Sequence, residues 1–357
     1  MPKHVDYLII GQGMAGSLLG WELIKQGCSI HIIDNQTENA SQIAAGLINP
    51  VTGMRLVKNA DIENLLPCAQ QTYQALSDFF QQDFYISKDM LRIVRNQKEL
   101  LKFEQRCQDQ SYLDYLVPEL QTPPASIQAP LGVIQQKNTG YLLTRNLLNC
   151  LKDFFQQKQC YQASQFDYQD LQFEPSISYQ GITAKKIIFC EGYQAIHNPW
   201  FKYLPFQLAK GEILTLTAKQ PLSDKMLNYG RWFIPLGNLQ FRTGATFTHE
   251  QLDTLPTSQG RQLLLQALTQ VMPSLSSTTL IKHQANIRPT TLDKAPFIGL
   301  HPEYGNLSIF NGFGAKGSLQ IPYYSQQFVQ YLLKQQPFTL EVDCQRVKAP
   351  SIKKHYT

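Results

Sequence analysis

The sequence predicts an α/β protein, α+β taken as a whole, on three observations. The chain opens on DYLIIGQGMAGSLL, where an apolar run leads through three glycines into a helical pattern. Its middle contains runs of strand length such as GEILTLT, RWFIPL and LQFRTGATF. Near the end, SIFNGFGAKGSLQ repeats the glycine spacing of the opening, again between a predicted strand and a predicted helix. Strand–turn–helix units at both ends of a strand-rich middle are typical of this fold class.

The opening glycines lie at the first turn of a predicted strand–helix–strand unit. VDYLII has the length of a buried strand, SLLGWELIKQG has apolar residues at helical spacing, and SIHIID forms a second strand ending at Asp34. Glycines permit a tight turn and let the main chain approach a phosphate that the helix N-terminus attracts. The residues expected to bind a dinucleotide pyrophosphate are Gly11, Gly13, Met14, Ala15 and Gly16.

Asp34 and the loop after it distinguish between dinucleotides. A carboxylate 23 residues after Gly11 accepts hydrogen bonds from ribose hydroxyls and disfavours a 2′-phosphate, which leaves NAD or FAD. The following segment, ASQIAAGLINP, is rich in small residues and offers accessible main chain against which a flat ring can lie. We therefore predict FAD, with Ser41, Ala45 and Gly46 among its contacts.

Composition and charge argue against several other classes of protein. The 357 residues are 43% hydrophobic and 17% charged, as in globular domains, and a net charge of +5 does not by itself indicate nucleic-acid binding. The seven cysteines form no C-x-x-C pair and the seven histidines no metal-binding spacing, so no metal site is predicted. No apolar run reaches about 18 residues and no targeting segment is recognised, so we expect a cytoplasmic protein without membrane contact.

Further motifs occur in a characteristic order along the chain. Gly140-Tyr141 enters a predicted helix, and KKIIFCEG, KGEILTL, FIPLGNLQFRTGAT, IRPTTLDKAPFIG and GFGAKG follow one another. With the opening glycine motif and SQIAAG, this set resembles the D-amino acid oxidase (DAO) superfamily of FAD-dependent oxidoreductases. The resemblance is to the branch of glycine oxidase and the FAD domain of the tRNA-modifying MnmC protein, and it covers nearly the whole chain. It implies a Rossmann-like FAD-binding domain.

The resemblance also implies that the FAD-binding domain is discontinuous, and the sequence pattern agrees with such a division. We assign residues 1–83, 145–205 and 284–357 to the FAD-binding domain. Residues 84–144 and 206–283 are assigned to an antiparallel β-rich substrate domain, because the second of these segments alternates as strands do.

Two residues take their expected roles from the resemblance. Gly192, in KKIIFCEG, occupies the turn that packs on the flavin in this family. Arg288 occupies the R-P motif whose arginine clamps the substrate carboxylate in glycine oxidase and its relatives, and is a predicted catalytic residue. A guanidinium suits that role because it holds a planar carboxylate through two parallel hydrogen bonds. The alternative for Arg288 is a structural ion pair with Asp293 or Glu212.

The second glycine motif is not expected to bind a second dinucleotide. Only about 20 residues follow its helix, too few for another strand–helix–strand half. A lysine at a helix N-terminus is unfavourable unless an anion is near, and reduced flavin carries negative charge. Lys316 is therefore the second predicted catalytic residue, and a solvent-exposed lysine is the alternative. The residues expected to aim a helix N-terminus at the flavin ring of the same FAD are Gly312, Gly314, Ala315, Lys316 and Gly317.

The resemblance implies oxidation of a C–N bond in a small amino acid or secondary amine by hydride transfer to flavin N5, with oxygen or another acceptor reoxidising the flavin. Sarcosine-oxidase relatives attach FAD through a cysteine near the TTLD-type segment; no cysteine lies between residues 191 and 343, so non-covalent FAD is expected. The alternatives are MnmC-like oxidation of a carboxymethylaminomethyl group on tRNA wobble uridine, 2-hydroxy-acid oxidation on the same fold, and a flavoprotein without turnover. The basic tail around Lys353 and Lys354 favours tRNA slightly, whereas the lack of a methyltransferase domain and of a dense basic face disfavours it.

Overall fold

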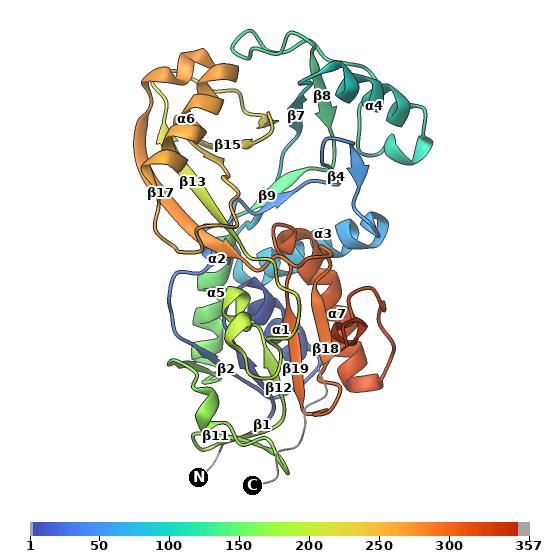
Figure 1. Ribbon diagram of the computed structural model, residues 1–357, viewed down its shortest axis with the longest axis vertical. Helices are drawn as coiled ribbons and strands as arrows, with labels where there is room; N and C mark the ends of the chain where they lie inside the picture. The colour runs from blue at the N-terminus through green and yellow to red at the C-terminus, as the bar shows by residue number, and fades with distance from the viewer. Residues whose placement is uncertain (1–2, 349–357) are drawn as a thin grey trace. The chain divides into compact units, whose positions relative to one another are not determined.

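The computed structural model describes residues 3–348, and the chain divides into two compact units (Figure 1). Unit 1 contains the chain up to Gln42, Arg145–Ala209 and the chain from Arg288 onward, and unit 2 contains Ile43–Thr144 and Lys210–Ile287. The predicted domains differ from these units mainly at residues 43–83, which were assigned to the FAD-binding domain and belong to unit 2. Lys353 and Lys354 of the basic tail lie outside the described residues.

Unit 1 is built on a seven-stranded sheet with the order β10-β2-β1-β12-β19-β18, in which β11 also pairs with β12. The five strands from β10 to β19 run parallel to their neighbours, and β11 and β18 run antiparallel to theirs. The bounds of the strands are β1 Lys3–Ile10, β2 Ile30–Asp34, β10 Tyr161–Ala163, β11 Ile177–Tyr179, β12 Ile182–Phe189, β18 Phe297–Leu300 and β19 Leu307–Asn311.

The helices of unit 1 include those that follow the two glycine motifs. Helix α1 begins directly after Gly13, and Gly27, with a φ of +80°, comes just after its end. The bounds of the α-helices are α1 Met14–Lys25, α2 Ala40–Ile43, α5 Thr144–Gln157 and α7 Gly317–Lys334, and those of the 3₁₀ helices are η2 Tyr168–Asp170, η3 Gly192–His197 and η5 Cys344–Arg346. Of these, α2 and α5 each reach across a unit boundary by one residue.

Both faces of the sheet in unit 1 are covered. Helix α1 packs closely on one face, because a Cβ at Gly20 would lie 3.1–3.5 Å from the side chains of Ile9, Ile30 and Ile32. The other face carries an apolar cluster of strand residues and aromatic rings, which includes Leu8, Ile10, Ile33, Ile187, Phe189, Phe166, Tyr179 and Phe201. A parallel sheet buried on both faces explains why its strands read as nearly continuous apolar runs.

Unit 2 is built on a second seven-stranded sheet, ordered β17-β13-β16-β15-β14-β7-β8, and helix α6 covers one of its faces. Two small sheets, β3-β9-β6 and β4-β5, complete its strands. The strand bounds are β3 Leu47–Ile48, β4 Val51–Thr52, β5 Val57–Lys58, β6 Tyr85–Ser87, β7 Met90–Ile93, β8 Val133–Gln136, β9 Gly140–Leu142, β13 Ala209–Thr217, β14 Met226–Asn228, β15 Trp232–Gly237, β16 Gln240–Gly244 and β17 Thr279–Arg288. The helices are α3 Ile62–Phe80, α4 Gln97–Cys107, α6 Ser258–Val271, η1 Gln110–Tyr112 and η4 Pro273–Ser277.

The predicted α/β class is confirmed. The opening unit is observed as β1, α1 and β2 in parallel register, and the strand in KKIIFCEG is β12. The strands RWFIPL and LQFRTGATF appear as the antiparallel pair β15 and β16. Within the described residues, no strand follows α7, so the second glycine motif is not part of a second strand–helix–strand half.

Candidate functional site

The first glycine motif brings the end of β1 very close to the start of α1. Gly11 has a φ of +102°, and a Cβ there would lie 2.6 Å from the carbonyl oxygen of Cys190. A Cβ at Gly16 would overlap the carbonyl oxygen of Gly11. Only glycine satisfies these approaches without moving main chain, so the turn is as tight as a phosphate-binding strand-to-helix connection requires.

Helix α1 begins with amide groups available for an acceptor. Its N-cap residue Gly13 supplies no side-chain hydrogen bond, and its first turn contains no acidic residue. The Met14 amide donates to the hydroxyl of Ser41 at 3.1 Å, so this predicted cofactor residue lies over the start of the helix. Ala15, the next residue of the helix, is half-buried. The partial positive charge of such a helix end attracts anions.

Asp34 lies at the end of β2, where two main-chain amides orient its carboxylate. Oδ2 accepts from the Gln12 amide at 2.8 Å and Oδ1 accepts from the Gln36 amide at 2.8 Å. The hydroxyl of Tyr161 lies 3.5 Å from Oδ1, and burial together with the charge of Asp34 raises the pKa of Tyr161. Each carboxylate oxygen has a further lone pair, so Asp34 can accept more hydrogen bonds.

The turn after β12 contains an acidic residue that the sequence analysis did not single out. Gly192 has a φ of +59°, and a Cβ there would meet nothing within 4 Å. The adjacent Glu191 accepts from the Tyr168 hydroxyl at 2.5 Å and from the Asn198 side-chain amide at 2.8 Å. Burial raises the pKa of Glu191 to about 7. An acid directly before a turn glycine at the end of a buried strand is the sequence signal that marks it.

The second glycine motif packs on the segment that follows Arg288. A Cβ at Gly312 would lie 2.9 Å from the methyl group of Thr291, and one at Gly314 would lie 2.8 Å from that of Thr290. The Gly314 amide donates to the carbonyl oxygen of Pro289 at 3.3 Å. The structure therefore brings the motif GFGAKG and the R-P segment together within unit 1, although 24 residues separate Arg288 from Gly312 in the sequence.

Lys316 is the N-cap residue of α7 and makes no side-chain capping bond. Its side chain is half-buried, whereas its neighbour Ala315 is exposed. Burial lowers the pKa of Lys316, and the positive charge of Lys294 lowers it further. Gly317 begins the helix proper, and a Cβ there would meet the flexible end of Ile321 at 3.1 Å. Two lysines and a helix N-terminus create a local positive potential that favours an anionic group.

Arg288 ends β17 and is half-buried. Burial lowers its pKa to about 10, so the guanidinium is charged at neutral pH. The two carboxylates considered as its structural partners have contacts with other residues. Asp293 binds Arg346 at 2.9 Å, and Glu212 accepts from His283 at 2.7 Å and from the Thr257 hydroxyl at 2.7 Å.

The loop from Ser41 to Gly46 is held by main-chain contacts. Gly46 has a φ of +68°, its carbonyl oxygen accepts from the Leu142 amide at 2.9 Å, and a Cβ there would overlap Leu142. Ala45 is half-buried and packs against the cluster of Met90, Tyr141, Met226 and Ile234. Any side chain larger than hydrogen at Gly46 would displace the start of β3.

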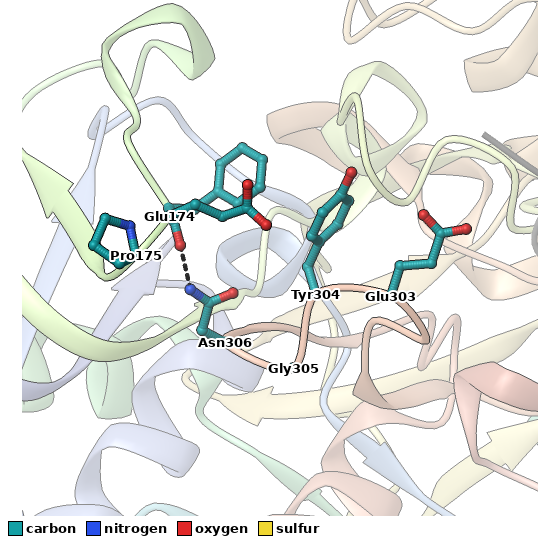
Figure 2. A pocket seen from close by; sticks show the side chains of 7 residues that line it. Glu174, Pro175, Glu303, Tyr304, Gly305 and Asn306 are labelled. Atoms are coloured by element: carbon teal, nitrogen blue, oxygen red, sulfur yellow. Dashed lines mark hydrogen bonds between the residues drawn. The ribbon is translucent and has the colours of Figure 1, made fainter. Parts of the chain in front are cut away.

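A cavity of about 660 Å³ lies at the opposite edge of the sheet in unit 1, next to the start of β19, and contains none of the predicted site residues. Figure 2 shows the residues that line it: Phe173, Glu174, Pro175, Glu303, Tyr304, Gly305 and Asn306. The side-chain amide of Asn306 donates to the carbonyl oxygen of Phe173, so two of the lining segments are linked by a hydrogen bond. The glycine turns, which follow the carboxyl ends of the strands, are a better candidate site because ligands of α/β sheets bind there.

Across residues 3–348, no group of His, Cys, Asp and Glu side chains has the arrangement of a metal site. The same part of the chain contains no helix long and apolar enough to cross a membrane. Cys190 and Cys344, which flank the cysteine-free stretch of the sequence, are buried free thiols.

Comparison with solved structures agrees with this architecture. Glycine oxidase from Geobacillus kaustophilus superposes with a TM-score of 0.81 over 94% of this chain and 96% of its own, at 18% sequence identity. Iminodiacetate oxidase from Chelativorans superposes with a TM-score of 0.79 over 93% of this chain and 96% of its own, also at 18% identity. At such low identity these likenesses establish the fold.

Curated relatives match at the level of sequence. Glycine oxidase of Pseudomonas putida is 29% identical over 38% of this chain and 37% of its own length. The MnmC bifunctional protein of tRNA 5-methylaminomethyl-2-thiouridine biosynthesis from Legionella pneumophila is 22% identical over 90% of this chain and 54% of its own length. The chain thus matches little more than a third of that glycine oxidase and about half of that MnmC protein. The model of the family described as FAD dependent oxidoreductase (DAO) matches residues 6–330, nearly the whole chain. The protein therefore belongs to the DAO family of FAD-dependent oxidoreductases.

Proposed function

We propose that this protein oxidises a C–N bond of a small amino acid or secondary amine, with FAD bound non-covalently. The observation that carries the proposal is the position of three glycine turns. They follow β1, β12 and β19, which are adjacent and parallel, so Gly11, Gly192 and Gly312 lie at the same edge of one sheet. That edge is where ligands of open α/β sheets bind.

The residues at this edge fit a single extended dinucleotide. The turn at Gly11–Gly16 offers main chain and the start of α1 for a pyrophosphate, and the oriented carboxylate of Asp34 suits ribose hydroxyls. The open space beside Gly192 and the positive end of α7 at Lys316 suit a flat ring that carries negative charge when reduced. We propose that both helix ends face the same FAD.

When bound, FAD supplies the acceptor for a hydride from the substrate carbon at flavin N5. The protein's own residues supply orientation and charge. We propose that Arg288 holds the substrate carboxylate through two parallel hydrogen bonds, since its guanidinium is half-buried and stays charged below a pKa of about 10. We propose that Lys316 stabilises negative charge at the ring. Unit 1 then corresponds to a cofactor domain and unit 2 to a substrate domain; the sheet of unit 2 is largely antiparallel, with one parallel pair, β14 and β7.

The proposal is tested by a substrate screen that follows flavin bleaching without oxygen. Glycine, sarcosine, proline, iminodiacetate and 2-hydroxy acids are mixed in turn with the purified yellow protein. Bleaching by an amine or amino acid is the expected result, and peroxide formation after air is admitted then identifies an oxidase. Bleaching by 2-hydroxy acids alone, or by none of these compounds, would contradict the C–N assignment.

The role of Arg288 is tested by replacing it with alanine and with lysine. Arg288→Ala is expected to raise KM for carboxylate substrates by about 100-fold while FAD stays bound, because a charge-assisted bidentate contact is lost. Arg288→Lys is expected to recover part of that loss, because an ammonium keeps the charge without the planar geometry. Arg261→Ala, which removes an exposed arginine of α6, is the control and should leave KM unchanged. An unchanged KM in Arg288→Ala would exclude the clamp.

The second candidate is oxidation of the carboxymethylaminomethyl group on tRNA wobble uridine, favoured by the match to MnmC along 90% of this chain. That reaction also breaks a C–N bond next to a carboxylate, so Arg288 would keep its role. Unfractionated tRNA that binds the protein, is released steeply by salt and bleaches the flavin would establish this candidate. Bleaching by a free amino acid without any tRNA affinity would reject it.

A further inference from the structure

Arg242 lies in the middle of the sheet of unit 2, where an arginine is unusual. It belongs to β16, which is flanked by β13 and β15, and it pairs with Thr215 and Ile234. Its neighbours Phe241 and Thr243 point to the opposite face and are fully buried. The face that Arg242 shares with Ile234 carries the apolar cluster on which Ala45 packs. A charged group in such a place needs strong hydrogen-bond acceptors to offset its desolvation.

Arg242 donates to two consecutive carbonyl groups in the segment from Ser41 to Gly46, which comprises the end of α2 and the loop before β3. Nη1 donates to the carbonyl oxygen of Ala44 at 2.9 Å, and Nη2 donates to the carbonyl oxygen of Ile43. One rigid guanidinium therefore fixes two successive peptide planes. In a trans peptide the N–H points opposite to the C=O, so the amide of Ala45 faces away from Arg242.

The same loop is fixed at both of its ends. Ser41 accepts a hydrogen bond from the Met14 amide, and Gly46 is held against Leu142 through its carbonyl oxygen. The segment is thus held by hydrogen bonds at four residues, Ser41, Ile43, Ala44 and Gly46, and its middle residues Ala44 and Ala45 carry only methyl groups. A rigid main chain is needed where backbone atoms meet a ligand.

We propose that Arg242 is a positioning residue, which holds the loop from Ser41 to Gly46 in the conformation that meets the cofactor. The inference rests on the proposed function and on the expectation from the sequence that Ser41, Ala45 and Gly46 contact FAD. Arg242 itself touches main chain of the loop and acts through it. Its replacement changes how the flavin is held, whereas replacement of an arginine that only stabilises unit 2 does not.

The experiment compares Arg242→Met with Arg106→Met. Arg106 is also half-buried in unit 2 and also donates to a main-chain carbonyl, that of Leu56 at 3.1 Å, but it lies at the end of α4. The FAD dissociation constant is measured by dilution of each purified holoenzyme, together with the visible absorption maximum and the melting temperature. Arg242→Met is expected to weaken FAD binding about tenfold or more and to shift the absorption maximum. Arg106→Met is expected to lower the melting temperature without either change.

Two further measurements keep the proposal testable should Arg242→Met fold poorly. Arg242→Lys retains the charge and can reach one of the two carbonyls. Its FAD affinity is therefore expected to fall by only about threefold. Added guanidinium ion should restore FAD affinity to Arg242→Ala, because it can replace the missing donors. An Arg242→Lys or Arg242→Met protein with wild-type FAD affinity and spectrum would overturn the proposal. A wild-type protein that binds no FAD would instead overturn the proposed function, so the two failures are distinguishable.

Discussion

The two G-x-G-x-x-G motifs of this chain have the same spacing but different surroundings. At Gly11 and Gly16 the close neighbours are main-chain carbonyl oxygens, those of Cys190 and Gly11. At Gly312 and Gly314 they are the methyl groups of two threonines that follow Arg288. The first motif is required by a tight strand-to-helix connection, whereas the second shapes a loop against the R-P segment. The same pattern therefore reports two different constraints, and within residues 3–348 only the motif at Gly11 completes a strand–helix–strand unit.

The two motifs also differ in the charge beside them. Glu191 lies next to the Cys190 carbonyl that Gly11 approaches, whereas Lys316 and Lys294 lie at the second motif. Burial raises the pKa of the acid and lowers the pKa of Lys316, so both are shifted toward the neutral form. A bound anionic group would offset the desolvation of the charged lysine, whereas it would not stabilise the charged form of the acid. The four predictions that follow test these differences.

The largest effect is expected from Gly16→Ala. The added methyl group would overlap the carbonyl oxygen of Gly11, and main chain has no flexible end that can move aside. We expect the protein to lose FAD and its free energy of unfolding to fall by about 3 kcal/mol. Urea denaturation measures the free energy of unfolding, and flavin absorbance measures the FAD that stays bound. A variant that keeps its flavin would show that the first motif tolerates a side chain. The two glycine motifs would then not differ in their need for glycine.

The next effect is the dependence of the free energy of unfolding on pH that Glu191 contributes. Its folded pKa of about 7 lies above the unfolded value, so the folded protein binds more protons between pH 4.5 and 7. The contribution of Glu191 to stability is complete below pH 4.5 and is lost as the pH rises through 7, a change of about 3 kcal/mol. Glu191→Gln should therefore gain stability relative to the wild type as the pH rises from 5 to 8. Parallel stability curves for the two proteins, measured by urea denaturation, would contradict this.

A smaller effect is expected at the second motif from Lys316→Met. Removal of positive charge near the ring should make the reduction potential of the flavin more negative by about 30 mV, which corresponds to about 1.4 kcal/mol for two electrons. Lys316→Arg keeps the charge and serves as the control. Equal potentials in the wild type and in Lys316→Met, measured by reductive titration, would mean that Lys316 does not interact with the flavin.

The smallest effect is expected from Gly317→Ala, at the third glycine of the second motif. A Cβ there meets only the movable end of Ile321, and alanine favours the helix that begins at this residue. The free energy of unfolding should stay within about 0.5 kcal/mol of the wild type. If Gly317→Ala instead proves as damaging as Gly16→Ala, the two motifs serve the same purpose.

The sequence predicted the parts of this fold that depend on local pattern. The apolar run before Gly11, the helical spacing after Gly16 and the acid at Asp34 are read directly from neighbouring residues, and the structure has β1, α1 and β2 there. The contact between GFGAKG and the R-P segment was not predicted, because no local pattern reports a contact between separate segments.

Contacts formed by distant residues could not be read from the sequence. Arg242 meets Ile43 and Ala44 across nearly 200 residues, and the pattern of β16 alone suggests only a strand. Glu191 acquires its partners Tyr168 and Asn198 only when β12 and η3 are placed. Residues 43–83 join unit 2 because β3 pairs with β9, a pairing between two short strands that no alternation of residues predicts.

We infer that both glycine motifs serve one FAD. The most direct test is the number of dinucleotides per chain, measured by heat release of flavin from the purified protein and by equilibrium titration with FAD and with NAD. We expect one FAD per chain, no binding of NAD, and a shifted potential of that same flavin in Lys316→Met. Two dinucleotides per chain, or one FAD together with one NAD, would contradict the account.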